Sequence, residues 1–351
     1  MDKELREYAL QLYKKNRFAP VLVLLRVTKT CNARCVMCNF WKEPSKGYSL
    51  EKFKQIVGSA KRLGAKRIRL TGGEPTIWKH FFEALDFISE SGLESAFITN
   101  GLNMSPSFCK KVAERNVRQV IFSLDSFTPR IHDGLRGVKG GWKKTVKAMK
   151  TLSNIRSNHN NPTILVNFVV SNKNFREISD VIEMGKDSLF EEVNLIPIRK
   201  VPSLLLSVDE IKNFNKEVVP IIEKRLQESK IGLTSGTPFI FGQSEDDLVS
   251  AAKGDYSADF YSKNDCVACK YILFIDSEGN VFPCNNTPYA KELFKAGNVF
   301  DEPLEKIWGG KRIQEIRLLA GKSGVCRGCE LKNRVFNSMA GKVVAGEEGV
   351  F

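Results

Sequence analysis

The sequence predicts an α/β fold built on a parallel β-sheet. Between Val21 and Ser229, short apolar runs alternate six times with amphipathic stretches of helical length. Such alternation is typical of βα units, in which crossover helices join parallel strands. With 351 residues and a hydrophobic content of 42%, the chain is long enough for one large domain and a smaller one. Six βα units fit either a doubly wound sheet or a barrel.

Each expected element has a local signal in the sequence. The expected strands are the short apolar runs at 21–28, 66–71, 94–99, 119–124, 164–170 and 192–197. The helices carry apolar residues at helical spacing: 50–63, 80–91, 105–116, 141–155, 175–188 and 208–228. Ser105 and Pro106 suit the N-cap and the first position of the third of these helices.

Three cysteines follow the first expected strand. Cys31, Cys35 and Cys38 have the spacing C-x3-C-x2-C. Thiolates are the ligands that select iron–sulfur clusters, and three of them leave one iron of a four-iron cluster without a protein ligand. An open coordination position can bind a substrate or a cofactor. The alternative is a zinc site or three unrelated thiols, although zinc ligands usually come in Cys or His pairs and no fourth ligand lies nearby.

The run TCNARCVMC at residues 30–38 resembles the signature of the radical S-adenosylmethionine (SAM) enzymes. In that family SAM chelates the open iron, and one electron from the reduced cluster cleaves it to methionine and a 5′-deoxyadenosyl radical. The resemblance implies a partial (β/α)6 TIM-like barrel, with its wide mouth at the carboxyl ends of the strands. It covers most of residues 18–200.

Two further strand ends resemble the SAM-binding motifs of this family. Gly72, Gly73 and Glu74 follow the second strand, where two glycines let the backbone approach a ligand closely. The resemblance implies that this backbone binds the SAM amino group and that the Glu74 carboxylate fixes the loop; a plain turn is the alternative. Ser123 and Asp125 share one face at the end of the fourth strand. The resemblance implies that Ser123 contacts the SAM ribose or carboxylate and that Asp125 faces the substrate.

Two other polar residues are candidate cofactor contacts. Asn167 interrupts the apolar fifth strand, and a polar side chain there needs a partner, which is either a ligand or another group inside the barrel. Arg136, followed by Gly137, resembles a family position shortly after the fourth strand. It either pairs with the SAM carboxylate in bidentate fashion or is exposed at the surface.

A second group of cysteines lies toward the C-terminus. The expected β-hairpin at 270–283 would bring Cys266 close to Cys284, and a C-x2-C pair follows at Cys326 and Cys329. On spacing alone, these four thiols fit a structural zinc site. They resemble the twitch module, a shortened SPASM domain, which implies that they hold an auxiliary [4Fe-4S] cluster. Cys269 is a fifth thiol: a replacement ligand, a catalytic hydrogen donor or an idle neighbour.

These observations divide the chain into four parts. They are an N-terminal helix (1–17), a radical SAM partial barrel (18–232), a linker or insertion rich in Gly, Ser and Asp (233–265), and a twitch/SPASM-like auxiliary-cluster domain (266–351). The apolar face of the first segment predicts a helix that covers the barrel rather than a membrane anchor. Clustered cysteines and the absence of a signal peptide predict a cytoplasmic protein with no membrane partner.

The resemblance implies a substrate class only coarsely. The leading expectation is a small polar metabolite, sugar-like or aminocyclitol-like, that is oxidised with the auxiliary cluster as electron acceptor. A peptide substrate is the alternative, with thioether or carbon–carbon crosslinking or epimerisation as the reaction. Only 30 residues precede Cys31, so a peptide-recognition domain would have to come from a partner.

The net charge of +14 allows further expectations. It suits an anionic substrate or an acidic electron donor such as flavodoxin or ferredoxin, or it reflects lysine dispersed over solvated helix faces. Together with the C-x2-C pairs it also fits a zinc-stabilised nucleic-acid-binding protein, the alternative that is not an enzyme. The chain has no long basic tract and no aromatic RNA-binding signature, so no specific nucleic-acid partner is expected.

Overall fold

The strands within the described part of the chain form one ten-stranded sheet. The computed structural model describes residues 3–156, 161–199, 201–234, 241–242, 244–256, 266, 268–285 and 287–320. The strand order is β10-β9-β8-β1-β2-β3-β4-β5-β6-β7, and from β8 through β1 to β7 all neighbours are parallel. The strands are β1 Leu22–Thr28, β2 Arg67–Gly72, β3 Glu94–Thr99, β4 Val117–Ser123, β5 Thr163–Val170, β6 Glu192–Pro197, β7 Gly232–Leu233, β8 Ile272–Ile275, β9 Asn280–Phe282 and β10 Gly297–Asn298.

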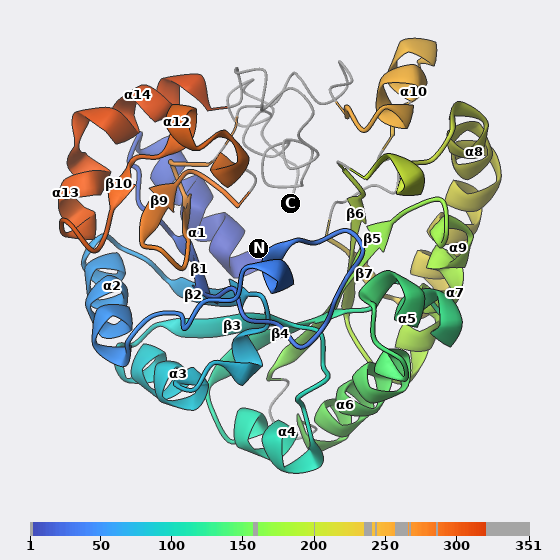
Figure 1. Ribbon diagram of the computed structural model, residues 1–351, viewed down its shortest axis with the longest axis horizontal. Coiled ribbons are helices and arrows are strands. Elements are labelled where there is room, and N and C mark those ends of the chain that lie inside the picture. The colour runs from blue at the N-terminus through green and yellow to red at the C-terminus, as the bar shows by residue number, and fades with distance from the viewer. Residues whose placement is uncertain are drawn as a thin grey trace.

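The helices surround these strands as an outer ring, except α1, which lies inside the ring in this view (Figure 1). They are α1 Lys3–Lys14, α2 Leu50–Arg62, α3 Phe81–Glu90, α4 Pro106–Ala113, α5 Pro129–Arg136, α6 Gly141–Ile155, α7 Ile178–Glu183, α8 Val208–Asn213, α9 Val219–Ser229, α10 Glu245–Ala252, α12 Lys291–Phe294, α13 Leu304–Gly309 and α14 Lys311–Leu319. Every residue of β1 is buried, as expected of a parallel strand that is covered on both faces. The partial barrel of six βα units is therefore confirmed.

The region of α8 and α9 differs from the single helix expected at 208–228. A π-helical turn, Phe214–Val218, separates the two helices. Pro220 follows this turn and lacks the N–H that an α-helix would bond to the carbonyl of Lys216. The regular α-helical pattern is interrupted where that hydrogen bond is lost. The expected linker at 233–265 also contains a helix, α10, with a capping box formed by Ser244 and Asp247.

The C-terminal hairpin continues the barrel sheet. β8 and β9 are antiparallel, which confirms the expected hairpin. β8 also lies parallel to β1, with Leu22 opposite Ile272 and Leu25 opposite Ile275. This part of the C-terminal module therefore lies directly beside the strand that leads into the first three cysteines (Figure 1).

The N-terminal helix packs on the start of that strand. Leu5, Ala9 and Leu10 of α1 form a buried cluster with Val21 and Tyr271. The expected helix covering the barrel is present, and it packs where β1 and β8 begin. Among the described residues, no helix is both long enough and apolar enough to cross a bilayer.

Candidate functional site

Cys31, Cys35 and Cys38 lie in the segment between β1 and α2, which we call the cysteine loop (residues 29–48). In Figure 1 this segment crosses the front of the strands, in dark blue. All three cysteines are partly exposed, form no disulfide and line one cavity of about 190 Å³. Burial raises the pKa of Cys31 to about 11 and raises that of Cys35 as well. A bound metal ion would deprotonate such a thiol outright.

The cysteine loop is held by the end of α5, a helix that the sequence did not predict. The backbone N–H of Arg34 donates to the carbonyl of Arg136 (3.1 Å), and that of Val36 donates to Leu135 (3.0 Å). Inside the loop, the indole Nε1 of Trp41 donates to the carbonyl of Cys35 at 3.4 Å. These bonds fix the backbone around Cys35 from both sides.

Gly72 and Gly73 allow the loop after β2 to lie against the cysteine loop. Gly73 donates its N–H to the carbonyl of Thr28 at 2.8 Å. A Cβ at Gly73 would lie 2.3 Å from the carbonyl oxygens of both Lys29 and Thr30, and one at Gly72 would lie 2.4 Å from that of Thr28. Real Cβ contacts are never that short, so this close approach requires glycine. Both glycines line the cavity with the cysteines.

The carboxylate of Glu74 ties two strand ends together. It is 1% exposed. One oxygen accepts from Thr76 N (3.1 Å), Thr76 Oγ1 (2.7 Å) and Thr99 Oγ1 (2.8 Å), and the other accepts from Asn100 N (2.7 Å). Burial raises the pKa of Glu74, and these hydrogen bonds oppose that rise. The loop-fixing geometry is present; the contact of this loop with SAM stays a prediction.

Replacing Gly73 with Ala is expected to weaken SAM binding about tenfold or more. The added methyl group must displace backbone rather than a flexible side chain, which costs about 1–3 kcal/mol. Iron content and SAM affinity by anaerobic equilibrium dialysis would measure the effect. Gly134→Ala is the matched control, because a Cβ there meets nothing within 4 Å. Wild-type SAM affinity in Gly73→Ala would contradict the prediction.

Arg136 points inward, so the surface-exposed alternative is wrong. Its side chain is only 14% exposed; Nε lies 2.6 Å from Asp125 Oδ2, and Nη1 lies 3.9 Å from Cys35 Sγ. It also lines the cavity. The guanidinium thus lies beside the cysteines with part of its charge balanced by a carboxylate, where a SAM carboxylate could pair with it.

Asp125 is the ion-pair partner of Arg136. It is fully buried behind Arg136 and is not among the residues that line the cavity. Its other oxygen accepts from Val169 N at 2.9 Å. Its own N–H donates to Nδ1 of His132 (3.2 Å), an imidazole whose pKa burial lowers to about 4. The structure gives Asp125 a positioning role; its contact with a substrate stays a prediction.

Ser123, Asn167 and Asn194 form a row across β4, β5 and β6. The register places Ser123 opposite Asn167 and Asn167 opposite Asn194. Residues in register share a face of the sheet, and Ser123 lines the cavity. Asn194 Nδ2 donates to Asn167 Oδ1 at 2.8 Å, so the barrel-interior partner weighed for Asn167 exists. Asn194 was missed although it interrupts its strand as Asn167 does, because only the register shows that the two side chains meet.

The second group of cysteines is only partly described. Cys266 and Cys284 are partly exposed, whereas Cys326 and Cys329 lie outside the described residues. Cys269 is fully buried in the core, and its carbonyl accepts from Arg317 Nε at 2.8 Å. A buried thiol suits a packed neighbour better than a donor to substrate. The auxiliary ligand set and the catalytic role of Cys269 stay predictions.

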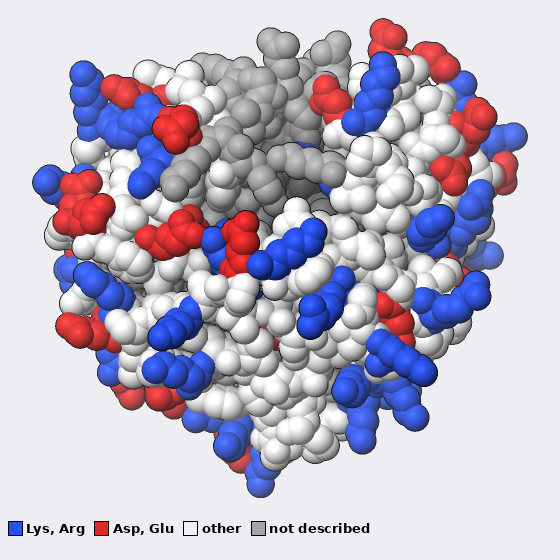
Figure 2. All heavy atoms as spheres, in the orientation of Figure 1, with Lys and Arg blue, Asp and Glu red and all other residues white. Residues whose placement is uncertain are grey.

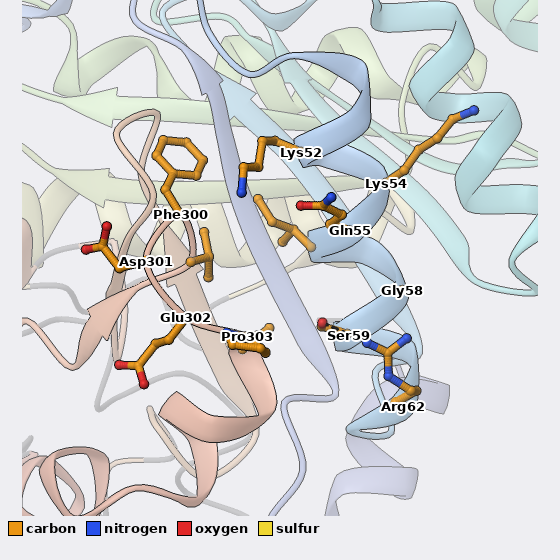
Figure 3. Close-up of a pocket in the computed structure, with 13 residues that line it drawn as sticks. Lys52, Lys54, Gln55, Gly58, Ser59, Arg62, Phe300, Asp301, Glu302 and Pro303 are labelled. Carbon is orange, nitrogen blue, oxygen red and sulfur yellow. Dashed lines mark hydrogen bonds between the residues drawn. The ribbon is translucent and has the colours of Figure 1, made fainter.

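A larger groove, of about 430 Å³, lies on the outside of the barrel (Figure 3). It separates α2 from the segment after β10. Lys52 and Arg62 line one side, and Phe300, Asp301 and Glu302 line the other. It contains none of the expected site residues, so the chemistry is assigned to the smaller cavity at the cysteines.

The smaller cavity fits an iron–sulfur cluster and SAM. It brings together three thiols, a loop backbone that only glycine permits, and a mostly buried guanidinium. In the described part of the chain, no three Cys, His, Asp or Glu side chains converge as they would around a single ion. A four-iron cluster instead binds each thiolate at a different iron.

Comparisons with known proteins agree with this site. The family model of the radical SAM superfamily matches residues 25–185, and that of the SPASM iron-sulfur cluster-binding domain matches residues 266–330. The AdoMet-dependent heme synthase of Methanosarcina barkeri is 24% identical, over 88% of both chains. The mycofactocin maturase MftC of Mycolicibacterium smegmatis is 23% identical, over 90% of this chain and 77% of its own.

Solved structures show the same fold. SuiB of Streptococcus suis bound to SAM has a TM-score of 0.65 at 16% identity, and covers 93% of this chain and 76% of its own. The structure of anSMEcpe with AdoMet and a peptide has a TM-score of 0.64 at 16% identity, over 93% and 96% of the two chains. The two family-model matches set aside the zinc-stabilised nucleic-acid-binding alternative. The chain belongs to the radical SAM superfamily: it is an iron–sulfur enzyme that uses a [4Fe-4S] cluster and SAM, and it carries a C-terminal SPASM domain for auxiliary cluster binding.

Proposed function

We propose that this enzyme modifies a peptide substrate. Among the curated relatives that match about nine-tenths of the chain are the mycofactocin maturase MftC and the Bacillus subtilis proteins AlbA and SkfB, named for subtilosin biosynthesis and sporulation killing factor maturation. SuiB has been solved with its precursor peptide. The expected sugar-like metabolite gains no support from these relatives.

A donor–acceptor pair inside the barrel carries the proposal. Asn194 is 7% exposed, and its Oδ1 has no hydrogen-bond partner within the described residues. Asn167 accepts from Asn194, and its own Nδ2 donates to no other described residue. A free carbonyl thus lies beside a free N–H on the face shared with Ser123. A peptide group supplies the complementary N–H and C=O in one plane, and buried polar atoms need such partners.

The other residues of the site have separable tasks. When bound, the cluster and SAM supply the 5′-deoxyadenosyl radical that abstracts hydrogen. The chain orients SAM through the glycine loop, with Arg136 available to its carboxylate and Ser123 lining the same cavity. The strands of the barrel are covered by helices on their outer side (Figure 1). The barrel around the site keeps water and other hydrogen donors away from the reacting carbon. The cytoplasmic location and the oxidation, crosslinking or epimerisation outcome stay predictions.

Hydrogen transfer from labelled extracts would test the substrate class. Cells that make the enzyme would be grown in deuterated medium, and their extract would be separated into peptide and small-molecule fractions. The reconstituted enzyme, SAM and dithionite would then be added to each, and deuterium in 5′-deoxyadenosine measured by mass spectrometry. The proposal expects label from the peptide fraction and its loss after protease treatment.

Two results would overturn the proposal. If the small-molecule fraction transfers label and protease treatment does not reduce that transfer, the substrate would be a small metabolite and not a peptide. Label from a porphyrin-containing fraction would favour a heme-type substrate, the second candidate, which is suggested by the heme synthase that matches 88% of both chains. Asn194→Leu gives a second readout: it should reduce transfer from the peptide fraction while SAM affinity is kept.

A further inference from the structure

The turn of the C-terminal hairpin contacts both ends of the cysteine loop. We call residues 276–279, between β8 and β9, the hairpin turn. At the start of the loop, Nζ of Lys29 forms an ion pair with Glu278. Figure 2 shows basic and acidic side chains at the centre of this face, where the loop crosses in Figure 1. At the end of the loop, the hydroxyl of Tyr48 donates to the carbonyl of Asp276, and both of these residues are buried. The hairpin turn therefore bridges the two ends of the loop.

A third contact joins the middle of the cysteine loop to the same hairpin. The guanidinium carbon of Arg26 on β1 lies 4.0 Å from the centre of the Phe40 ring and 4.8 Å from that of Phe274 on β8. Arg26 is only 8% exposed, and cation–π contacts are strongest where water is excluded. Phe40 lines the cavity with the three cysteines. Through Arg26, the hairpin is therefore attached to a wall of the cluster site.

The hairpin turn is itself a rigid support. Oδ1 of Asp276 accepts from the backbone N–H of Glu278 and of Asn280, both at 2.9 Å. Asn298 on β10 donates to the carbonyl of Glu278 at 2.9 Å. Gly279 has a φ of +82°, and a Cβ there would lie 2.6 Å from Oδ1 of Asn298, so the turn packs tightly against β10. These bonds fix the turn independently of the cysteine loop.

The open end of the hairpin carries two of the expected auxiliary ligands. Cys266 precedes β8, and Cys284 follows β9. The two strands are in register, with Phe274 opposite Phe282 and their ring centres 6.4 Å apart. A four-residue strand such as β8 extends about 13 Å. One short, packed element thus runs from the expected auxiliary ligands to the cysteine loop.

We propose that the hairpin positions the cysteine loop, so that auxiliary-cluster occupancy and SAM binding are coupled. A loop held at three points loses little further freedom when it binds its cofactors, and that preorganisation favours binding. Auxiliary ligation fixes the open end of the hairpin, and Lys29, Tyr48 and Arg26 carry its position to the loop. Coupling of this kind is reciprocal, so SAM in turn favours the ordered hairpin. The inference depends on the family of the enzyme and not on its peptide substrate.

Tyr48→Phe tests the positioning role with the smallest change, because it removes only the hydroxyl that reaches the hairpin turn. SAM affinity of the reconstituted enzyme, measured by anaerobic equilibrium dialysis, should fall about fivefold while the iron content is kept. Tyr271→Phe is the matched control, since Tyr271 is also buried and its hydroxyl donates to the carbonyl of Arg17, away from the loop. It should bind SAM within about twofold of wild type. Equal affinities in the two variants would overturn the positioning role.

A charge exchange tests the second contact without altering the core. Lys29→Glu should weaken SAM binding about threefold or more, because Glu43 and Glu278 both lie near this position. Adding Glu278→Lys should recover most of that loss. A double variant that binds SAM no better than Lys29→Glu alone would contradict the role of this ion pair in positioning.

A double-mutant cycle tests the coupling itself. Cys284→Ala should weaken SAM binding about fivefold in the wild-type background and less than about twofold when Tyr48 is already Phe, because the hairpin then no longer controls the loop. Equal losses in both backgrounds would overturn the coupling. Wild-type SAM affinity in Cys284→Ala would overturn it as well.

Discussion

Cys35→Ala is expected to abolish SAM cleavage and to remove about four of the roughly eight irons that two clusters would supply. The reason is positional. Cys35 lies between the backbone anchors at Arg34 and Val36, beside the guanidinium of Arg136, on the cavity that the glycine loop closes. With that thiolate missing, only two cysteines of the cysteine loop remain. Iron and sulfide analysis, together with 5′-deoxyadenosine formation in the presence of dithionite, would measure both losses.

Two other cysteines supply the controls. Cys109 is buried in the hydrophobic core on α4, where its thiol donates to the carbonyls of Met104 and Ala148. Cys109→Ala should therefore keep full iron content and SAM cleavage. Cys284→Ala should lose the other irons but keep some SAM cleavage that yields no product. If Cys35→Ala still formed 5′-deoxyadenosine, the assignment of the first cluster would be wrong.

Local sequence signals predicted the barrel and the cavity well. The six βα units follow from apolar runs whose burial is nearly complete, as in β1 and β4. Ser105 caps α4 as expected, since its side chain accepts from Phe108 N. The three cysteines and the two glycines come together because parallel strands end at one edge of the sheet.

Other features leave no local signal in the sequence. The pairing of β8 with β1 joins residues about 250 positions apart, and no local sequence pattern near either strand predicts it. α5 is short and polar on average, so its pattern was overlooked, although it anchors the cysteine loop. The ion pair of Asp125 also depended on that helix, because its partner Arg136 is the last residue of α5.

Asp125→Asn is expected to destabilise the fold by about 3–5 kcal/mol, the usual effect of leaving a buried charge without its partner. Asp125 is fully buried and Arg136 is 14% exposed, so water cannot replace the lost carboxylate. Burial alone would lower the pKa of Arg136, but Asp125 and Cys35 outweigh burial and raise it, so the charge stays on the guanidinium. Thermal unfolding under anaerobic conditions should show the loss as a clear drop in Tm.

The double variant Asp125→Asn with Arg136→Met separates stability from cofactor binding. Removing both charges removes the uncompensated ion, so Tm should recover to near the wild-type value. SAM affinity should not recover, because the cation available to the SAM carboxylate has gone. If the double variant bound SAM as tightly as the wild type, Arg136 would be a structural partner of Asp125 and nothing more. If Asp125→Asn alone melted at the wild-type temperature, the ion pair would not stabilise the site at all.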